Sequence, residues 1–156
     1  MQDVEFFEKG IGPKVVLFHS SASSAGQWKV LMDHFKDKFH FISVNLIGYG
    51  NTTAWNQNKV QTLLDQVKLL EKIPSLSGSR FSIVGHSFGG SVAMKAAKHY
   101  FDQVEKLVLV EPNPFYLLRQ EKKAEAFAEV LVLRNKIKTE FNNDWEQAVS
   151  FFADYW

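Results

Sequence analysis

The residues best suited to chemistry lie in one short segment, Gly85-His86-Ser87-Phe88-Gly89-Gly90. The segment has glycines two positions before and two positions after a serine, and it stands between an apolar run and a helical pattern. Glycines permit a sharp strand-to-helix turn, in which a neighbouring Cβ would clash with the strand or the helix. Such a turn brings the Ser87 hydroxyl near a helix N-terminus, where free N–H groups favour developing negative charge. The segment therefore predicts a nucleophilic serine with the Phe88 amide as one oxyanion donor; the alternative is a turn that only packs a helix or binds a phosphate.

The elements around this segment alternate between strands and helices. Apolar and aromatic runs predict four strands and an earlier edge strand, at residues 15–18, 39–46, 81–85, 106–111 and 3–8. Apolar residues at helical spacing predict helices over residues 27–38, 60–70 and 87–100. This alternation indicates an α/β fold, a mostly parallel sheet with helices on both faces. In such sheets, ligands bind at the carboxyl ends of the strands, which is where Ser87 is expected.

Three segments together resemble the α/β-hydrolase superfamily: LFHSSASSAGQW, NLIGYGNT and IVGHSFGGSVAM, in this order along the chain. The resemblance covers about residues 12–115 and implies acyl transfer on a carboxylic ester or a related acyl substrate. Ser87 would attack the carbonyl, a histidine would take its proton, a carboxylate would orient the histidine and two amides would hold the oxyanion. Within His19-Ser20-Ser21, the resemblance places the second oxyanion amide on Ser21.

Two positions depart from the pattern of the superfamily. Ser20 stands where the superfamily usually has glycine, so the geometry of the loop that carries Ser21 is less closely specified. Asn45 stands where the superfamily typically has aspartate. Because that aspartate has a structural role in its loop, we expect the second departure to affect function little.

The proton acceptor that the superfamily places after its nucleophile and acid has no counterpart here. His99 is the only histidine after Ser87, and it lies on the same predicted helix about 18 Å away. His19 is the nearest alternative base, although the resemblance gives it a structural role. Glu111 ends the strand that follows the nucleophile strand and is the candidate catalytic acid; the alternative is a glutamate that caps the next connection.

The carboxyl-terminal part of the chain differs in pattern from the rest. Helical patterns at residues 115–139 and 144–154 follow one another with no strand between them, and the resemblance implies a helical lid over residues 113–156. We therefore expect residues 1–156 to form a single, incomplete α/β-hydrolase domain, truncated after the start of its lid. Strand 106–111 would then be unpaired on one side, which predicts self-association through the sheet edge.

Composition excludes several classes of function. There is no cysteine, which rules out disulfides, cysteine-ligated zinc and a thiol nucleophile. The formal charge of +1 gives no electrostatic reason for binding nucleic acid or an anionic membrane. We expect a cytoplasmic protein without metal or cofactor that acts on a small ester-like molecule. The missing histidine leaves two alternatives open, a catalytically inactive fold that binds a ligand or partner, and a chain completed by a second polypeptide.

Overall fold

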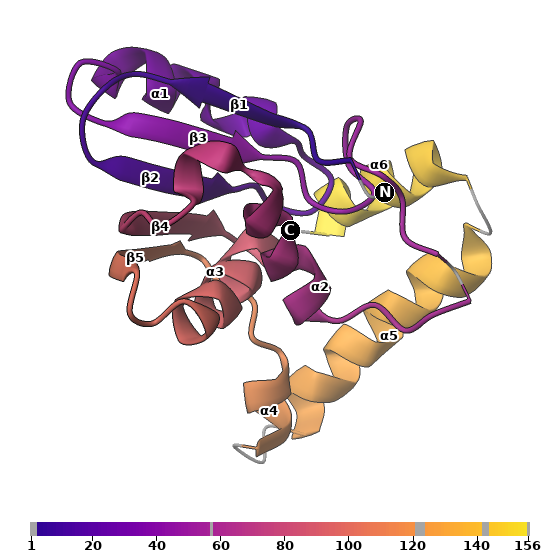
Figure 1. The fold of residues 1–156 in the computed structure, drawn as a ribbon. Coiled ribbons are helices and arrows are strands. Elements are labelled where there is room, and N and C mark those ends of the chain that lie inside the picture. Colours follow the sequence, from indigo (N-terminus) through magenta and orange to yellow (C-terminus); the bar gives the residue numbers. More distant parts are fainter. Residues whose placement is uncertain (1–2, 57, 121–123, 142–143, 156) are drawn as a thin grey trace. The chain divides into compact units, whose positions relative to one another are not determined.

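The computed structural model describes residues 3–56, 58–120, 124–141 and 144–155. The chain divides into two compact units, Met1–Asn113 and Pro114–Trp156. The first unit contains every strand of the described residues, and the second is built from helices (Figure 1).

The first unit is organised around a five-stranded sheet. Its strands are β1 (Phe6–Lys9), β2 (Lys14–Phe18), β3 (His40–Val44), β4 (Phe81–His86) and β5 (Val104–Val110). They lie in the order β1-β3-β2-β4-β5, and β1 is antiparallel to β3 while the other pairs are parallel. The prediction of a mostly parallel sheet in an α/β fold is confirmed.

Helices cover both faces of this sheet (Figure 1). On one face, Val16 and Phe18 of β2 belong to a buried cluster that includes residues of α2 (Leu63–Val67) and α3 (Phe88–His99). On the other face, the alternate residues Val15 and Leu17 pack with Met32 of α1 (Lys29–Phe35). The continuous apolar run of β2 is explained by burial on both sides, as expected for a central parallel strand.

The helical prediction for residues 60–70 is only partly correct. Thr62 and Asp65 form a capping box, so α2 begins at Leu63 rather than at residue 60. After α2 the chain tightens into a 3₁₀ segment, Lys68–Lys72, and Ile73 is extended, with φ −99° and ψ 105°. The extended conformation follows from Pro74, which disfavours helical geometry in the residue before it.

The second unit consists of α4 (Tyr116–Gln120), α5 (Ala124–Glu140) and α6 (Trp145–Tyr155). The helical pattern predicted over residues 115–139 corresponds to α4 and α5 in the described residues, and residues 121–123 lie outside them. The Phe141 and Phe151 rings have centroids 5.3 Å apart, and the Lys136 ammonium lies 4.5 Å from the Phe151 centroid. In the described ranges, no helix is both long enough and apolar enough to cross a membrane.

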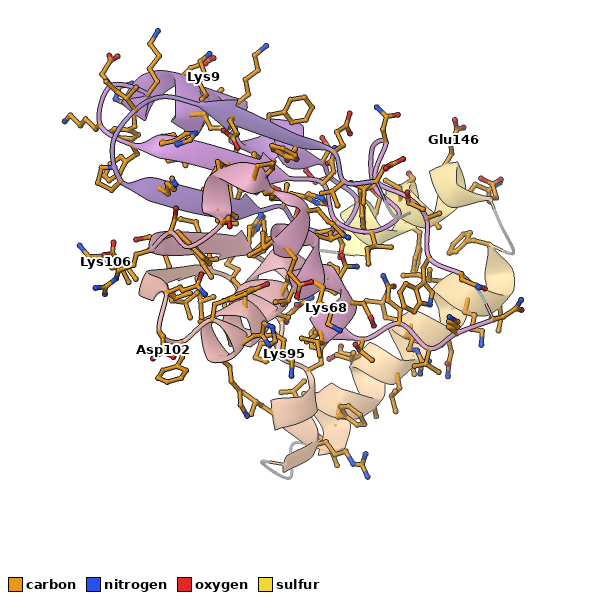
Figure 2. All side chains as sticks on the ribbon, viewed as in Figure 1. Lys9, Lys68, Lys95, Asp102, Lys106 and Glu146 are labelled. Atoms are coloured by element: carbon orange, nitrogen blue, oxygen red, sulfur yellow. The ribbon has the colours of Figure 1, made fainter. Side chains whose placement is uncertain are left out.

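Strand β5 forms an edge of the sheet, because among the described strands it pairs with β4 alone. Its side chains are largely exposed, and they include Leu107, Val108 and Val110 as well as Lys106, which Figure 2 labels. Unpaired backbone groups beside exposed apolar side chains are a template for pairing with another chain.

We expect the purified 156-residue polypeptide to self-associate at micromolar concentration through β5. A charge at the edge should oppose this pairing, so Val108→Lys should weaken association about tenfold in sedimentation velocity. Val30→Lys is the matched control, because Val30 is also exposed but lies on α1. A monomeric wild-type chain, or equal effects of the two substitutions, would contradict self-association through β5.

The His19 side chain links the end of β2 to the segment that follows β3 by a hydrogen bond. The side chain is 0% exposed, and its Nε2 accepts a hydrogen bond of 3.1 Å from the Leu46 amide. Its Nδ1 therefore carries the proton and donates to the Ser20 carbonyl at 2.7 Å. The Tyr49 ring meets the imidazole edge-on, with centroids 4.7 Å apart. Burial lowers the pKa of His19, and the bond to the Ser20 carbonyl opposes this only in part.

Stability should therefore fall on mild acidification, since the unfolded chain takes up a proton that folded His19 resists. His19 makes its full contribution to the free energy of unfolding above the pKa of about 6.5 that it has in the unfolded chain. This contribution is lost as the pH falls from there toward the lower pKa of His19 in the folded chain. One proton changes the unfolding free energy by at most about 1.4 kcal/mol per pH unit. The free energy of unfolding, measured with urea between about pH 8 and pH 5, should depend less steeply on pH in His19→Asn than in the exposed-site control His34→Asn. Equal dependence in both variants would contradict the assignment.

Candidate active site

Ser87 occupies the turn between β4 and α3. Its φ of 51° and ψ of −115° lie in a region that non-glycine residues rarely adopt. The amides of Gly90 and Ser91 donate to the Ser87 carbonyl at 2.9 and 3.2 Å, so the strained residue also opens the helix. Within the described part of the chain, the half-buried Ser87 hydroxyl makes no hydrogen bond. It is therefore available to react with a bound molecule.

Two glycines allow the backbone to approach itself closely at this turn. A Cβ on Gly89 would lie 2.4 Å from the carbonyl oxygens of both Phe18 and His19. A Cβ on Gly85 would lie 2.3 Å from the Gly89 carbonyl oxygen. These contacts are with backbone atoms, which cannot rotate away. The first turn of α3 therefore sits directly on the end of β2, from which the loop containing Ser20 and Ser21 departs.

The amides expected to bind an oxyanion lie at these two places. Phe88 is the first residue of α3, and Ser21 follows two residues after His19. Among the residues that the structure describes, neither amide donates a hydrogen bond to the protein. Ala22, directly after Ser21, has a φ of 54° and turns the loop sharply. Two unengaged amides on the segments that meet at Gly89 are chemically suited to a developing negative charge.

Glu111 follows β5 at the same end of the sheet. The Ser87 amide donates to the Val110 carbonyl at 2.9 Å, which fixes the end of β5 beside the turn. Glu111 itself has a φ of 43°, and its side chain is 88% exposed. Its Oε2 lies 4.0 Å from the His86 Nε2. The carboxylate thus faces the histidine that precedes Ser87 in sequence.

The histidines of the chain have other partners or positions. Both nitrogens of His19 are engaged in hydrogen bonds, so neither is free to take a proton from Ser87. His99 is the last residue of α3, at the opposite end of the helix from Ser87. His40 bonds to Glu8 at 3.0 Å, and His34 is exposed on α1. No group of three potential metal ligands gathers among the described side chains.

A glutamine that the motif analysis did not identify connects the loop after β2 with the nucleophile turn. Gln27 Oε1 accepts hydrogen bonds from both the amide and the hydroxyl of Ser20, each 3.0 Å long. Its Nε2 donates to the His86 Nδ1 at 3.0 Å. Ser20 stands where the resemblance leads one to expect glycine, but nothing in the sequence indicates Gln27 as its partner.

The other departure, Asn45, is explained by its neighbour Glu5. Buried Asn45 accepts a hydrogen bond from the Ala25 amide through Oδ1 at 2.7 Å and donates to the Glu5 carboxylate through Nδ2. Asn51 also donates to Glu5 from its backbone and side chain, and these bonds hold the pKa of that carboxyl below its usual value. An aspartate at position 45 would offer Glu5 a second negative charge in place of a donor. The amide therefore suits this position better than the usual acid.

Known proteins resemble this chain in sequence and in fold. The model of the alpha/beta hydrolase fold family matches residues 13–145. A pimeloyl-[acyl-carrier protein] methyl ester esterase of Nitrosomonas europaea is 29% identical over 121 residues, which are 78% of this chain and 46% of the relative. Human epoxide hydrolase 4 is 31% identical over 115 residues, covering 69% of this chain and 31% of the relative.

The fold is also that of solved hydrolases. A meta-cleavage product hydrolase superposes with a TM-score of 0.63 at 25% identity, covering 71% of this chain and 42% of that structure. The chain thus spans less than half the length of each of these proteins. The family match extends over most of the chain and includes β2, the turn at Ser87 and β5. The chain belongs to the alpha/beta hydrolase fold family.

Proposed function

We propose that this chain carries the nucleophile and the backbone oxyanion hole of a serine hydrolase acting on carboxylic esters or related acyl compounds. The observation that carries the proposal is the backbone of Ser87, held at positive φ between β4 and α3 with its hydroxyl unbonded among the described residues. Strained residues of this kind concentrate at functional sites. A helix N-terminus directly after the serine adds partial positive charge where an oxyanion would form.

The proposed reaction is acyl transfer in two steps. The Ser87 Oγ attacks the carbonyl carbon, the carbonyl oxygen becomes an oxyanion, and the amides of Phe88 and Ser21 donate hydrogen bonds to it. The intermediate collapses, the carbon–oxygen bond to the alcohol breaks, and the alcohol leaves with the proton that Ser87 gave up. Water then attacks the acyl-serine, releases the carboxylic acid and returns a proton to Ser87.

Proton transfer is the part of this mechanism that the chain supports least. We propose that the catalytic histidine is lacking in this chain, since the five histidines have the partners or positions given above. Glu111 is the proposed acid because it directly follows β5, whose last carbonyl, that of Val110, accepts from the Ser87 amide. Its present neighbour is His86, so it would need to turn toward an imidazole supplied beside Ser87.

The substrate class rests on the chemistry of serine and on the names of relatives. Serine forms an acyl ester with a carbonyl substrate, whereas displacement of a halide would call for a carboxylate at position 87. The esterase from Nitrosomonas europaea is named for a methyl ester of a carrier-bound acyl chain. We propose a small or medium ester or thioester as the substrate, and residues 113–156 as a helical lid segment.

A catalytically inactive binding module is the second candidate. It is favoured by one observation, that among the described residues no imidazole is hydrogen-bonded to the Ser87 hydroxyl. Such a module would keep the fold and a ligand pocket without activating the serine.

A fluorophosphonate probe with added imidazole separates the two candidates. We expect slow labelling of Ser87, accelerated about tenfold by millimolar imidazole, because a free base replaces part of the 10²–10⁴-fold that a positioned base contributes. Mass spectrometry of the labelled peptide should identify Ser87, and Ser87→Ala should remove the imidazole-dependent signal. Ser91→Ala is the matched control, since Ser91 lies one turn later on the same helix and bonds to Asn113.

Absence of Ser87 labelling in the folded chain, with or without imidazole, would contradict the hydrolase proposal and favour the binding module. Labelling that persists in Ser87→Ala would show that another nucleophile reacts.

A further inference from the structure

We infer that Gln27 is a positioning residue, which clamps the loop carrying the Ser21 amide to the strand end carrying Ser87. The inference deepens the proposed function and rests on it, because the relative position of these two segments matters to catalysis only if they act on one substrate. The clamp is defined here as Ser20, Gln27 and His86, joined by the three hydrogen bonds of the Gln27 amide.

The clamp acts one residue away from each proposed functional group. Ser20 immediately precedes Ser21, and His86 immediately precedes Ser87. All three hydrogen bonds are 3.0 Å long, within the ordinary range for direct contacts. The Gln27 side chain therefore joins the loop after β2 to the end of β4 just beyond their last paired positions, Phe18 and Gly85.

The chemistry of the three partners fixes the orientation of the glutamine amide. Ser20 presents two donors, its N–H and its O–H, so the carbonyl oxygen of Gln27 must face it. The opposite end must then donate, which makes Nδ1 of His86 an acceptor and places the imidazole proton on Nε2. That nitrogen points toward the Glu111 carboxylate, 4.0 Å away. If the Gln27 amide were flipped, its NH₂ group would face the Ser20 N–H, and two donors cannot form a hydrogen bond.

Gln27 is itself held on a short, well-anchored 3₁₀ turn, Ala25–Trp28. Ser24 caps this turn by accepting from the Gly26 amide at 3.2 Å. Buried Ala25 donates to Asn45 at 2.7 Å and accepts from the Ser43 hydroxyl at 2.8 Å. Because the turn is tied to β3 and the segment after it, the glutamine side chain projects from a rigid support. Rigid support of this kind is what allows a side chain to position its neighbours.

The clamp also accounts for serine at position 20. The Ser20 hydroxyl supplies the second of the two bonds to Gln27, a contact that glycine cannot make. Ala22 has positive φ, so the loop turns sharply just after the amide of Ser21. Oxyanion donors must be placed to within a fraction of an ångström to be effective. A loop that turns this sharply benefits from a fixed point directly before the donor.

Amide hydrogen exchange in the full chain tests the clamp without reference to catalysis. In Gln27→Met, the Ser20 amide loses its acceptor and should exchange at least about tenfold faster. The Ile47 amide, which bonds to Gln66 Oε1 at 2.8 Å, is an internal reference that should not change. The matched control is Gln61→Met, at an exposed glutamine outside the clamp. Unchanged exchange at Ser20 in Gln27→Met would overturn the inference.

Gln27→Glu separates positioning from mere packing. Its carboxylate still accepts from Ser20, so protection of the Ser20 amide should be restored. Because the new carboxylate can only accept, the His86 Nδ1 that faces it should now carry a proton. ¹⁵N NMR of the imidazole detects this proton directly. An Nδ1 that stays unprotonated in this variant would contradict the assigned contact. This second variant also covers the case in which Gln27→Met fails to fold.

Fluorophosphonate labelling with imidazole then connects the clamp to chemistry. Gln27→Met should lower the maximal labelling rate about tenfold while leaving the half-saturating probe concentration unchanged, and Gln27→Glu should recover most of the rate. Faster exchange at Ser20 with an unaltered labelling rate would overturn the positioning role. A wild-type chain that exchanges as expected but never labels would contradict the proposed function while supporting the clamp.

Discussion

The geometry of the site depends on the contact between the first turn of α3 and the end of β2. The absence of a side chain at Gly89 lets the helix backbone rest on the carbonyls of Phe18 and His19. That approach brings the start of α3, where Ser87 has positive φ, against the strand end from which the loop containing Ser21 departs. A strained residue persists only when its surroundings over-determine it, at a cost of about 1–3 kcal/mol. Here the Ser87 conformation is held by the hydrogen bond to the Val110 carbonyl, by the close contact at Gly89 and by the helix that follows.

The parts of this architecture that were predictable from sequence are those encoded locally. A continuous apolar run identifies β2, a short run rich in apolar residues identifies β4, and the glycine spacing around Ser87 identifies the turn, because each signal lies within a few adjacent residues. Boundaries set by capping were less accessible, as Thr62 shows by starting α2 later than the apolar pattern suggested. The clamp was not predictable, since Gln27 and His86 are 59 positions apart and neither is unusual where it stands.

Both departures from the superfamily pattern are matched by a polar partner elsewhere in the first unit. Asn45 meets Glu5 across 40 positions, and Ser20 meets Gln27 across 7. In each pair the donor and acceptor chemistry agrees, so the substituted residue gains a bond that the usual residue would not make. Buried polar groups are tolerated when they are satisfied in this way. The two departures are therefore each accommodated by a hydrogen-bond partner in the first unit.

The same reasoning bears on the base that the proposed function requires. Under the proposed function, the Ser87 hydroxyl and the Phe88 and Ser21 amides, which have no hydrogen-bond partner among the described residues, would be kept for substrate, because an unbonded polar group near the interior is otherwise costly. Removing the base alone leaves the oxyanion hole and its binding energy intact, and these by themselves contribute substantially to acyl transfer. Under the proposed function, the arrangement around Ser87 would supply the oxyanion hole but not the base. What such a site needs is a proton acceptor within hydrogen-bonding reach of one oxygen atom, which a second segment or a small base can provide without rebuilding the turn.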